Sequence, residues 1–237
     1  MRILAMECSA SPVSAAVICD GKVIGFSYSN IKLTHSQTLF PIIKSTLDSC
    51  RLAFRDIDAV SVSVGPGSFT GLRIGISSAK GLAEPKELKC VGVSTLLAAA
   101  YMFLGGDAVI CPVIDARRGQ VYNAVFDVCG KKVSRITDDR ALMIEDLKNE
   151  LAALREKTDK RIILCCDAAN AVFDSVKDIG GIRIAPESLL YQTAVGVGLY
   201  ANAAVISGEW TDAAGLEPVY LKLPQAEREL KAKRRED

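Results

Sequence analysis

Residues 58–75 read Asp-Ala-Val-Ser-Val-Ser-Val-Gly-Pro-Gly-Ser-Phe-Thr-Gly-Leu-Arg-Ile-Gly, and this stretch decides the fold. Its valine-rich first half, from Asp58 to Val64, predicts a buried strand, and a helix is expected from about Thr70 to Ala83. The glycine-rich turn between them places backbone N–H groups at the positive end of the helix dipole, which suits a phosphate or a carboxylate. A tight turn packed against a neighbouring segment is an equally good interpretation. A P-loop is excluded, because no Gly-Lys-Ser/Thr follows the glycines.

The helix after this turn carries a stripe almost without side chains. Gly71 and Gly75 lie four residues apart on one face, the stripe continues to Ala79, and Leu72 and Ile76 flank it. A glycine inside a helix costs about 1 kcal/mol against alanine, so a close approach of another backbone is expected to favour these two. That backbone belongs either to the same chain or to another subunit. The helix is predicted to be a contact surface.

Composition favours an ordinary globular protein of one large or two small domains. The 237 residues are 49% hydrophobic and 24% charged, and the formal net charge of +1 argues against a dedicated nucleic-acid binder. The apolar stretches around 96–104 and 194–206 fall short of the ~20 residues of a membrane span, so a cytoplasmic location is expected. The eight cysteines are scattered and favour free thiols, and His35 is the single histidine, which argues against a zinc site.

Along the chain, the pattern predicts two α/β halves. Strands are expected at 2–8, 13–19 and 22–29, with Asp20-Gly21 as a hairpin turn. Thr34 and Gln37 form an apparent capping box before a helix. After strand 90–93 and helix 96–104, the Gly105-Gly106 turn is the expected domain boundary. The second half is expected to hold these elements: strands 109–115, 120–128, 132–136 and 161–166, helices 143–155, 169–176 and 189–207, and an extended segment 218–223.

We therefore expect an α/β fold with mixed sheets flanked by helices, in two similar lobes. The first lobe spans residues 1–106 and the second 107–223, and a charged tail follows at 224–237.

Four motifs carry a resemblance to a known family. They are the run Gly65–Gly75, the segment His35-Ser36-Gln37-x-Leu39-x-Pro41, the block Asp115-Ala116-Arg117-Arg118-Gly119-Gln120-Val121-Tyr122, and Pro218–Leu221. In this order and over nearly the whole chain, they resemble the TsaB (YeaZ) family of tRNA threonylcarbamoyladenosine biosynthesis proteins. The resemblance implies two RNase H-like, actin-like lobes of the ASKHA fold.

It also implies a role without catalysis. Members of this family pair with a related catalytic subunit, TsaD, and a small ATPase, TsaE, docks where the two meet. ATP, Mg²⁺ and the catalytic metal belong to these partners, tRNA is reached through the complex, and the lone chain is expected to form a homodimer. No catalytic or metal-binding residue is expected in this chain, since residues 93–99 lack the His-x-x-x-His pair of the catalytic relative.

Two sets of site residues follow from this comparison. The first is a nucleotide cleft that has lost its chemistry, because Arg117-Arg118 and Asp167-Ala168 replace Gly-Gly turns and Glu7 replaces the usual aspartate. Its residues are Glu7, Ser9, Gly65, Gly67, Ser68, Asp115, Arg117 and Asp167. The second is a partner interface on the two N-terminal helices, made of Leu39, Ile43, Leu47, Gly71, Leu72, Gly75, Ile76 and Ala79.

Three other functions are considered. An ATP-dependent phosphotransferase or weak nucleotide hydrolase would use the glycine loop, Glu7 and Asp115, and it requires a Mg²⁺–nucleotide between the lobes. A metallopeptidase has little support, because the chain has one histidine and no zinc motif. Direct sequence-specific RNA binding lacks a basic-aromatic motif, although Arg117, Arg118 and the basic tail are placed to meet tRNA phosphates in a complex.

Overall fold

The computed structural model describes residues 1–31 and 33–222, so the expected charged tail at 224–237 lies outside the described residues. The first half of the chain forms a five-stranded sheet in the order β3-β2-β1-β4-β5. Its elements are β1 (Arg2–Glu7), β2 (Val13–Cys19), β3 (Lys22–Ser29), α1 (His35–Ser49), β4 (Ala59–Gly65), α2 (Phe69–Ala83), β5 (Lys89–Ser94) and α3 (Thr95–Tyr101), with single 3₁₀ turns at Phe54–Asp56 and Glu84–Lys86.

The three N-terminal strands confirm the predicted hairpin. β2 pairs antiparallel with β1 and β3, whereas β4 pairs parallel with β1 and β5. Asp20 and Gly21 both have positive φ, 49° and 76°, as a two-residue turn of the mirror-image type requires. The capping-box prediction is wrong in its hydrogen bonds. Thr34 does precede α1, but its hydroxyl donates to Gln37 Oε1 at 2.8 Å and caps no backbone N–H.

The second half forms a seven-stranded sheet with the path β10-β7-β6-β11-β12; in addition, β8 pairs with β6 and β9 pairs with β8. Its elements are β6 (Asp107–Asp115), β7 (Gln120–Asn123), β8 (Phe126–Cys129), β9 (Lys132–Arg135), β10 (Arg140–Met143), α4 (Ile144–Arg155), β11 (Ile162–Cys165), α5 (Ala169–Val176), β12 (Ile182–Ile184), α6 (Glu187–Leu190) and α7 (Ala194–Ile206).

Two predicted elements are each divided in two. The expected strand 120–128 is β7 and β8, which pair with opposite ends of β6. The interruption falls opposite Pro112, which has no N–H for a ladder, and Asn123 Nδ2 donates to the Pro112 carbonyl there at 3.1 Å. The expected helix 189–207 is α6 and α7, because the chain is extended at Thr193, whose hydroxyl caps α7 by accepting from the Val195 N–H.

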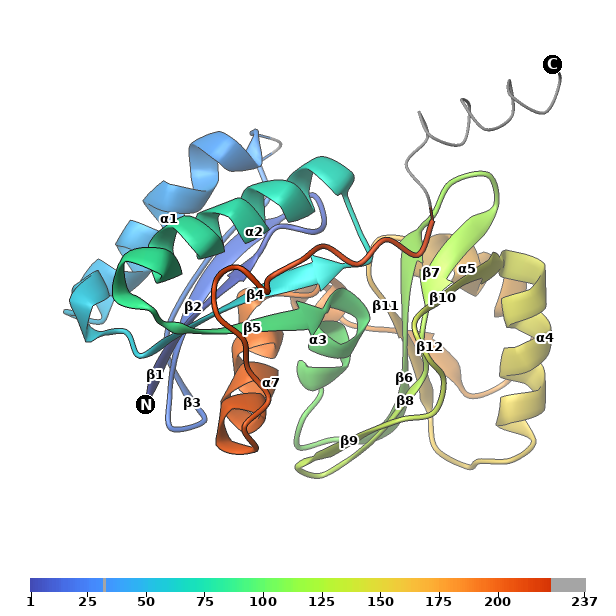
Figure 1. Cartoon of the computed structure of the whole chain (residues 1–237). Helices are drawn as coiled ribbons and strands as arrows, with labels where there is room; N and C mark the ends of the chain where they lie inside the picture. The colour runs from blue at the N-terminus through green and yellow to red at the C-terminus, as the bar shows by residue number, and fades with distance from the viewer. Residues whose placement is uncertain (32, 223–237) are drawn as a thin grey trace, which may run out of the picture.

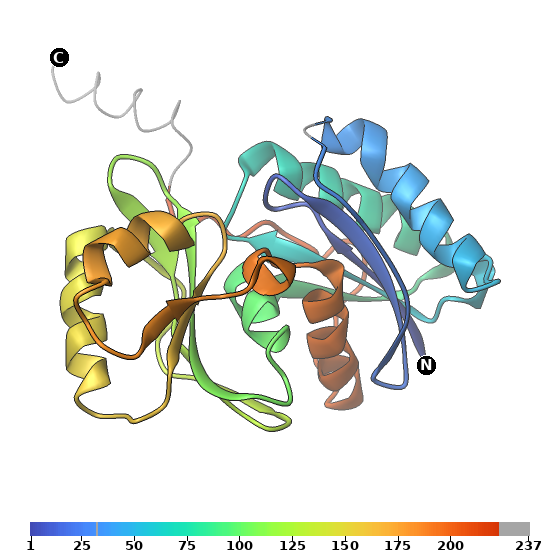
Figure 2. The same cartoon turned by 180° about the vertical axis from the view of Figure 1, so that it is seen from behind.

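The molecule is a stack of five layers (Figure 1). Helices α1 and α2 cover the outer face of the first sheet, α4 and α5 cover the outer face of the second, and α3 and α7 lie between the sheets. Figure 2 shows this middle layer from behind, with α7 beside α3. Four buried apolar clusters, one at each junction between layers, hold the stack together.

The lobes are not simple halves of the chain. Helix α7 falls in the range expected for the second lobe, yet it packs on β1, β2 and β5 of the first sheet, and Val197 and Ala201 share a cluster with Ile3 and Ile18. Farther on, Thr211 exchanges two backbone hydrogen bonds with Cys90 on β5, at 2.8 and 2.9 Å. The chain from α7 to Thr211 therefore belongs to the first lobe.

All eight cysteines are free, as predicted. Within residues 1–31 and 33–222, none of the helices has the length and apolar character needed to cross a bilayer.

Candidate functional site

A cleft of about 490 Å³ opens between the lobes, where β1, β4, β6 and β11 end. One wall comes from the β1–β2 turn, the first residue of α1 and the glycine loop. The other comes from the end of β6, the following turn, and the residue after β11. The lining residues are Ser9, Ala10, Ser11, His35, Gly67, Ser68, Phe69, Ile114, Asp115, Ala116, Arg117, Tyr122 and Asp167.

Glu7 lies beneath this cleft and is not part of its lining. Its side chain is 1% exposed, and its carboxylate accepts hydrogen bonds from the Ser9 N–H at 2.5 Å and from the Ser63 hydroxyl. Burial raises the pKa of the Glu7 carboxyl, and these hydrogen bonds oppose the rise only in part. The prediction that Glu7 belongs to the cleft is therefore wrong: its carboxylate holds the β1–β2 turn to β4.

The glycine loop is packed tightly against that same turn. Ser68 N–H donates to the Ser9 carbonyl at 2.7 Å, and a Cβ added to Gly67 would come within 2.6 Å of that oxygen. The Ser68 hydroxyl caps α2 by accepting from the Gly71 N–H. Gly65 does not line the cleft, and a Cβ there would lie 2.4 Å from the Val219 carbonyl oxygen. Of the two interpretations of the loop, the structure favours the tight turn over an open anion cradle.

The opposite wall is acidic. Asp167 Oδ1 accepts from the Asp115 N–H at 2.9 Å, and Asp115 in turn accepts from the Arg117 N–H and forms an ion pair with its guanidinium at 3.2 Å. Desolvation raises the pKa of the Asp167 carboxyl. Arg117 and Arg118 have φ of 65° and 58°, so this turn adopts the left-handed backbone that glycine favours. The predicted cleft residues Ser9, Gly67, Ser68, Asp115, Arg117 and Asp167 are thus brought together.

Sequence reasoning missed three aromatic or imidazole side chains at this cleft. His35, Phe69 and Tyr122 line it, although they come from α1, α2 and β7. The Nε2 atom of His35 is buried without a hydrogen-bond partner among the described residues. All three belong to the motifs that carry the family resemblance, so membership of a motif was the signal that pointed to them.

Within residues 1–31 and 33–222, no group of three histidine, cysteine or acidic side chains is placed to hold a metal ion. His35 has no hydrogen-bonded hydroxyl or thiol next to it in the described residues, so no nucleophile–base pair is formed there. The cleft walls carry acidic and basic side chains, and they enclose a defined space.

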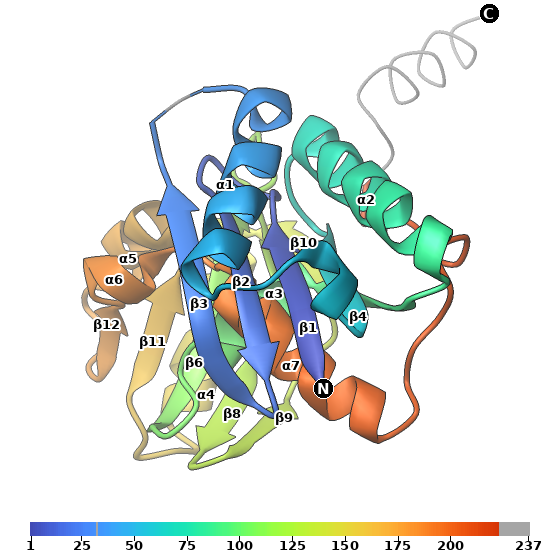
Figure 3. The same ribbon diagram turned by 90° about the vertical axis from the view of Figure 1, so that its left-hand side faces the viewer.

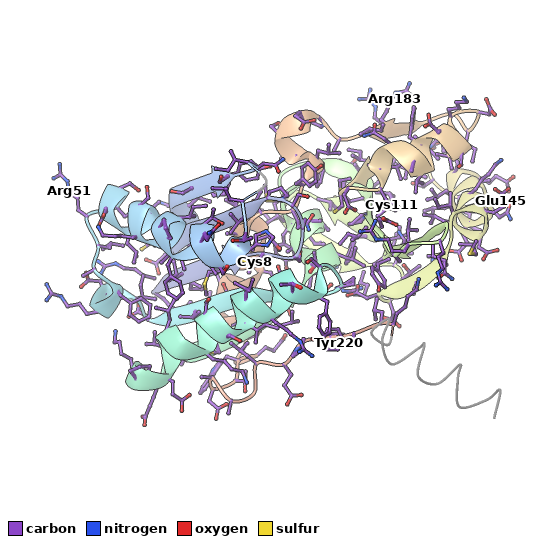
Figure 4. All side chains as sticks on the ribbon, turned by 90° about the horizontal axis from the view of Figure 1, so that it is seen from above. Cys8, Arg51, Cys111, Glu145, Arg183 and Tyr220 are labelled. Carbon is purple, nitrogen blue, oxygen red and sulfur yellow. The ribbon has the colours of Figure 1, made fainter. Side chains whose placement is uncertain are left out.

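The glycine stripe on α2 packs against other segments of the same chain. A Cβ on Gly71 would lie 2.0 Å from the Cys8 carbonyl oxygen, and one on Gly75 would lie 3.2 Å from Val62. In Figure 4 Cys8 lies beneath α2 at the centre of the first lobe. The whole predicted interface set is buried in the first lobe: Leu39, Ile43, Leu47, Gly71, Leu72, Gly75, Ile76 and Ala79. The prediction of a stripe left bare for a second subunit is therefore wrong for these side chains.

The outer surface of α1 and α2 is still available. The two helices lie side by side on the first sheet, with one long face turned away from it (Figure 3). Phe40 on α1 is 51% exposed and Phe69 on α2 is 40% exposed, which is high for side chains of this size. Arg73 and Ser77 continue the exposed face along α2.

Sequence comparisons place the chain among known proteins. Residues 25–162 match the family model described as TsaD, tRNA N6-adenosine threonylcarbamoyltransferase. Over 230 residues the chain is 30% identical to the tRNA threonylcarbamoyladenosine biosynthesis protein TsaB of Bacillus subtilis, and the match covers 96% of each protein. The TsaB protein of Escherichia coli is 38% identical over 128 residues, which is 53% of this chain and 55% of that protein.

Solved structures agree on the fold. YeaZ from Pseudomonas aeruginosa matches with a TM-score of 0.77 at 23% identity, covering 93% of this chain and 99% of that one. Component A of (R)-2-hydroxyglutaryl-CoA dehydratase from Acidaminococcus fermentans matches with a TM-score of 0.53 at 13% identity, covering 87% and 99%. The predicted ASKHA architecture, two actin-like lobes with mixed sheets flanked by helices, is confirmed.

Proposed function

Because the chain belongs to the TsaB (YeaZ) family, within the broader TsaD sequence family, it takes part in the biosynthesis of threonylcarbamoyladenosine in tRNA, and we propose that it does so as a non-catalytic subunit. In this proposal it is a scaffold that binds and activates a TsaD-like catalytic subunit. A TsaE-like small ATPase docks where the two meet, and tRNA is reached through the complex. In this proposal, Arg117, Arg118 and the lysines and arginines of residues 224–237 contact tRNA phosphates in the complex.

The position of Glu7 carries the non-catalytic part of the proposal. In the ASKHA resemblance this position holds the acidic residue of the nucleotide site, but here the carboxylate lies under the cleft and is 1% exposed. Ser9 and Ser63 occupy its oxygens, so it is not free to hold a Mg²⁺–nucleotide. Comparing the modification of tRNA by the purified partner proteins with and without this chain tests the proposal directly. Full modification without the chain would overturn it.

The purified chain is expected to show no saturable binding of ATP with Mg²⁺. The glycine loop already uses its Ser68 and Gly71 N–H groups within the chain, and Asp115 and Asp167 oppose a phosphate by charge. Isothermal titration calorimetry with ATP and Mg²⁺ gives the measurement, with the catalytic partner as the positive control. Tight binding would favour the phosphotransferase or hydrolase alternative, and no resident cofactor is proposed.

The partner surface is proposed to be the outer face of α1 and α2. A standard interface buries ~800 Å² on each protein and places aromatic side chains near its centre. Phe40, which is 51% exposed, is the aromatic residue of this face, whereas Phe69 lines the cleft and stacks on Tyr220. The same face is proposed to join two copies when the chain is alone, since a two-fold dimer uses one surface twice.

Phe40→Glu is expected to weaken binding of the catalytic partner by about tenfold or more, because it places a charge on the apolar part of this face. Fluorescence anisotropy or calorimetry with the purified partner measures the change. Ile206→Glu is the matched control: Ile206 is 75% exposed at the end of α7, away from α1 and α2, and its replacement should leave the affinity unchanged. Equal affinities of the two variants would remove α1 from the interface.

A further inference from the structure

The last described segment of the chain runs across both lobes. After Leu216, which is 1% exposed in the core under α2, residues Glu217–Lys222 pass the end of β4 and reach the turn between β6 and β7. Figure 1 shows this segment crossing from the first lobe to the second. We call residues 217–222 the strap.

On the first lobe the strap is held by backbone and aromatic contacts. Val219 N–H donates to the Val64 carbonyl at 2.8 Å, and the Val219 carbonyl occupies the space that a side chain on Gly65 would fill. The Tyr220 ring stacks on Phe69 with centroids 5.2 Å apart. In Figure 4 Tyr220 lies beside the first turn of α2.

Arg73 completes this attachment. Its Nε donates to the Tyr220 hydroxyl at 3.0 Å, and its guanidinium lies 3.9 Å from the centre of the Phe69 ring. A cation over the face of an aromatic ring is attracted to the electrons of the ring. The first turn of α2 is thereby fixed to the strap from two sides.

On the second lobe the strap is held by Lys222. Its ammonium donates to the Ala116 carbonyl at 2.9 Å and to Gln120 Oε1, and it lies 5.6 Å from the Tyr122 ring centre. Ala116 and Gln120 close the β6–β7 turn through the Ala116 N–H, which donates to the Gln120 carbonyl at 3.0 Å. The strap thus ends on the turn that carries Arg117.

The two attachments face each other across the cleft. Phe69 lines one wall, and Ala116 and Tyr122 line the other. From these contacts we infer that the strap fixes the separation of the two cleft walls, so that the lobes move as one rigid body. A chain built this way presents α1 and α2 at a constant angle to the second lobe. The inference does not depend on the proposed function.

Hydrogen exchange of the full-length protein, followed by mass spectrometry, tests the strap. Tyr220→Ala removes only first-lobe contacts, but it is expected to speed exchange in residues 115–122 of the second lobe about fivefold, because Lys222 loses its anchor. In the reverse direction, Lys222→Ala is expected to speed exchange in the first turn of α2 by a similar factor. Each effect appears on the lobe that the substitution does not touch.

Trp210→Ala is the matched control. Trp210 is an exposed aromatic residue on the chain between α7 and the strap, and its ring contacts Lys89 of the first lobe. Its replacement should leave exchange in residues 115–122 unchanged. If Tyr220→Ala and Lys222→Ala alter exchange only beside the substituted residue, the strap does not join the lobes and the inference is wrong.

Discussion

Gly71→Ala is expected to destabilise the protein by about 3 kcal/mol or more, at the upper end of what overpacking in a core costs. The added methyl group would lie 2.0 Å from the Cys8 carbonyl oxygen. That oxygen belongs to the backbone at the end of β1, which is hydrogen-bonded to β2 and β4, so it cannot move aside as a side chain would. Urea unfolding followed by circular dichroism measures the change.

Gly81→Ala supplies the control within the same helix. Gly81 is exposed, and a Cβ there would meet no described atom within 4 Å. Alanine should therefore stabilise α2 by up to about 1 kcal/mol, because glycine is the poorer helix former. If Gly71→Ala lowers the free energy of unfolding and Gly81→Ala raises it, contact with the Cys8 backbone is the reason that position 71 requires glycine. Equal effects would mean that the stripe is not packed on the β1–β2 turn.

The second large effect concerns Glu7 and pH. Burial raises the pKa of this carboxyl above its ordinary value of 4.5, so between that value and the native one the folded state binds more protons than the unfolded state. The free energy of unfolding therefore falls as pH rises through this window, by at most about 1.4 kcal/mol for each pH unit. Glu7→Gln removes the titration and should flatten this dependence.

Urea unfolding from pH 4 to pH 8 measures the effect. Glu7→Gln should gain stability relative to the parent protein as pH rises, because the buried amide needs no charge. Glu156→Gln, which changes an exposed carboxylate at the end of α4, should leave the pH dependence as it is. A parent protein and a Glu7→Gln variant with parallel pH profiles would show that the native carboxyl is not perturbed.

The elements that were predicted correctly are those for which neighbouring residues give a strong signal. The valine run of β4, the Asp20-Gly21 turn and the glycines before α2 each specify backbone geometry through neighbouring residues, and all three elements are present. The short strands β10 and β12, with four and three residues, carry too little periodicity to be recognised. The break before α7 had a local signal, since Thr193 is a typical helix cap, but the apolar run on both sides concealed it.

Long-range contacts explain what sequence reasoning could not decide. The glycines of α2 do indicate a close backbone approach, but only the fold shows that the backbone is Cys8, more than sixty residues away in the sequence. The same holds for Glu7, whose cleft position was inferred from its correspondence to the usual aspartate of the fold. Its side chain turns toward Ser63 on β4, a contact that the order of residues does not reveal.

The return of α7 to the first sheet has a consequence for synthesis on the ribosome. Ile3, Ile18 and Val91 of the first sheet pack against α7, which is translated about a hundred residues after β5. Until α7 emerges, one face of the nascent sheet is unprotected, and such apolar surface invites chaperones or aggregation. The N-terminal lobe is therefore expected to mature only after α7 has been made, even though all the strands of its sheet come about a hundred residues or more earlier.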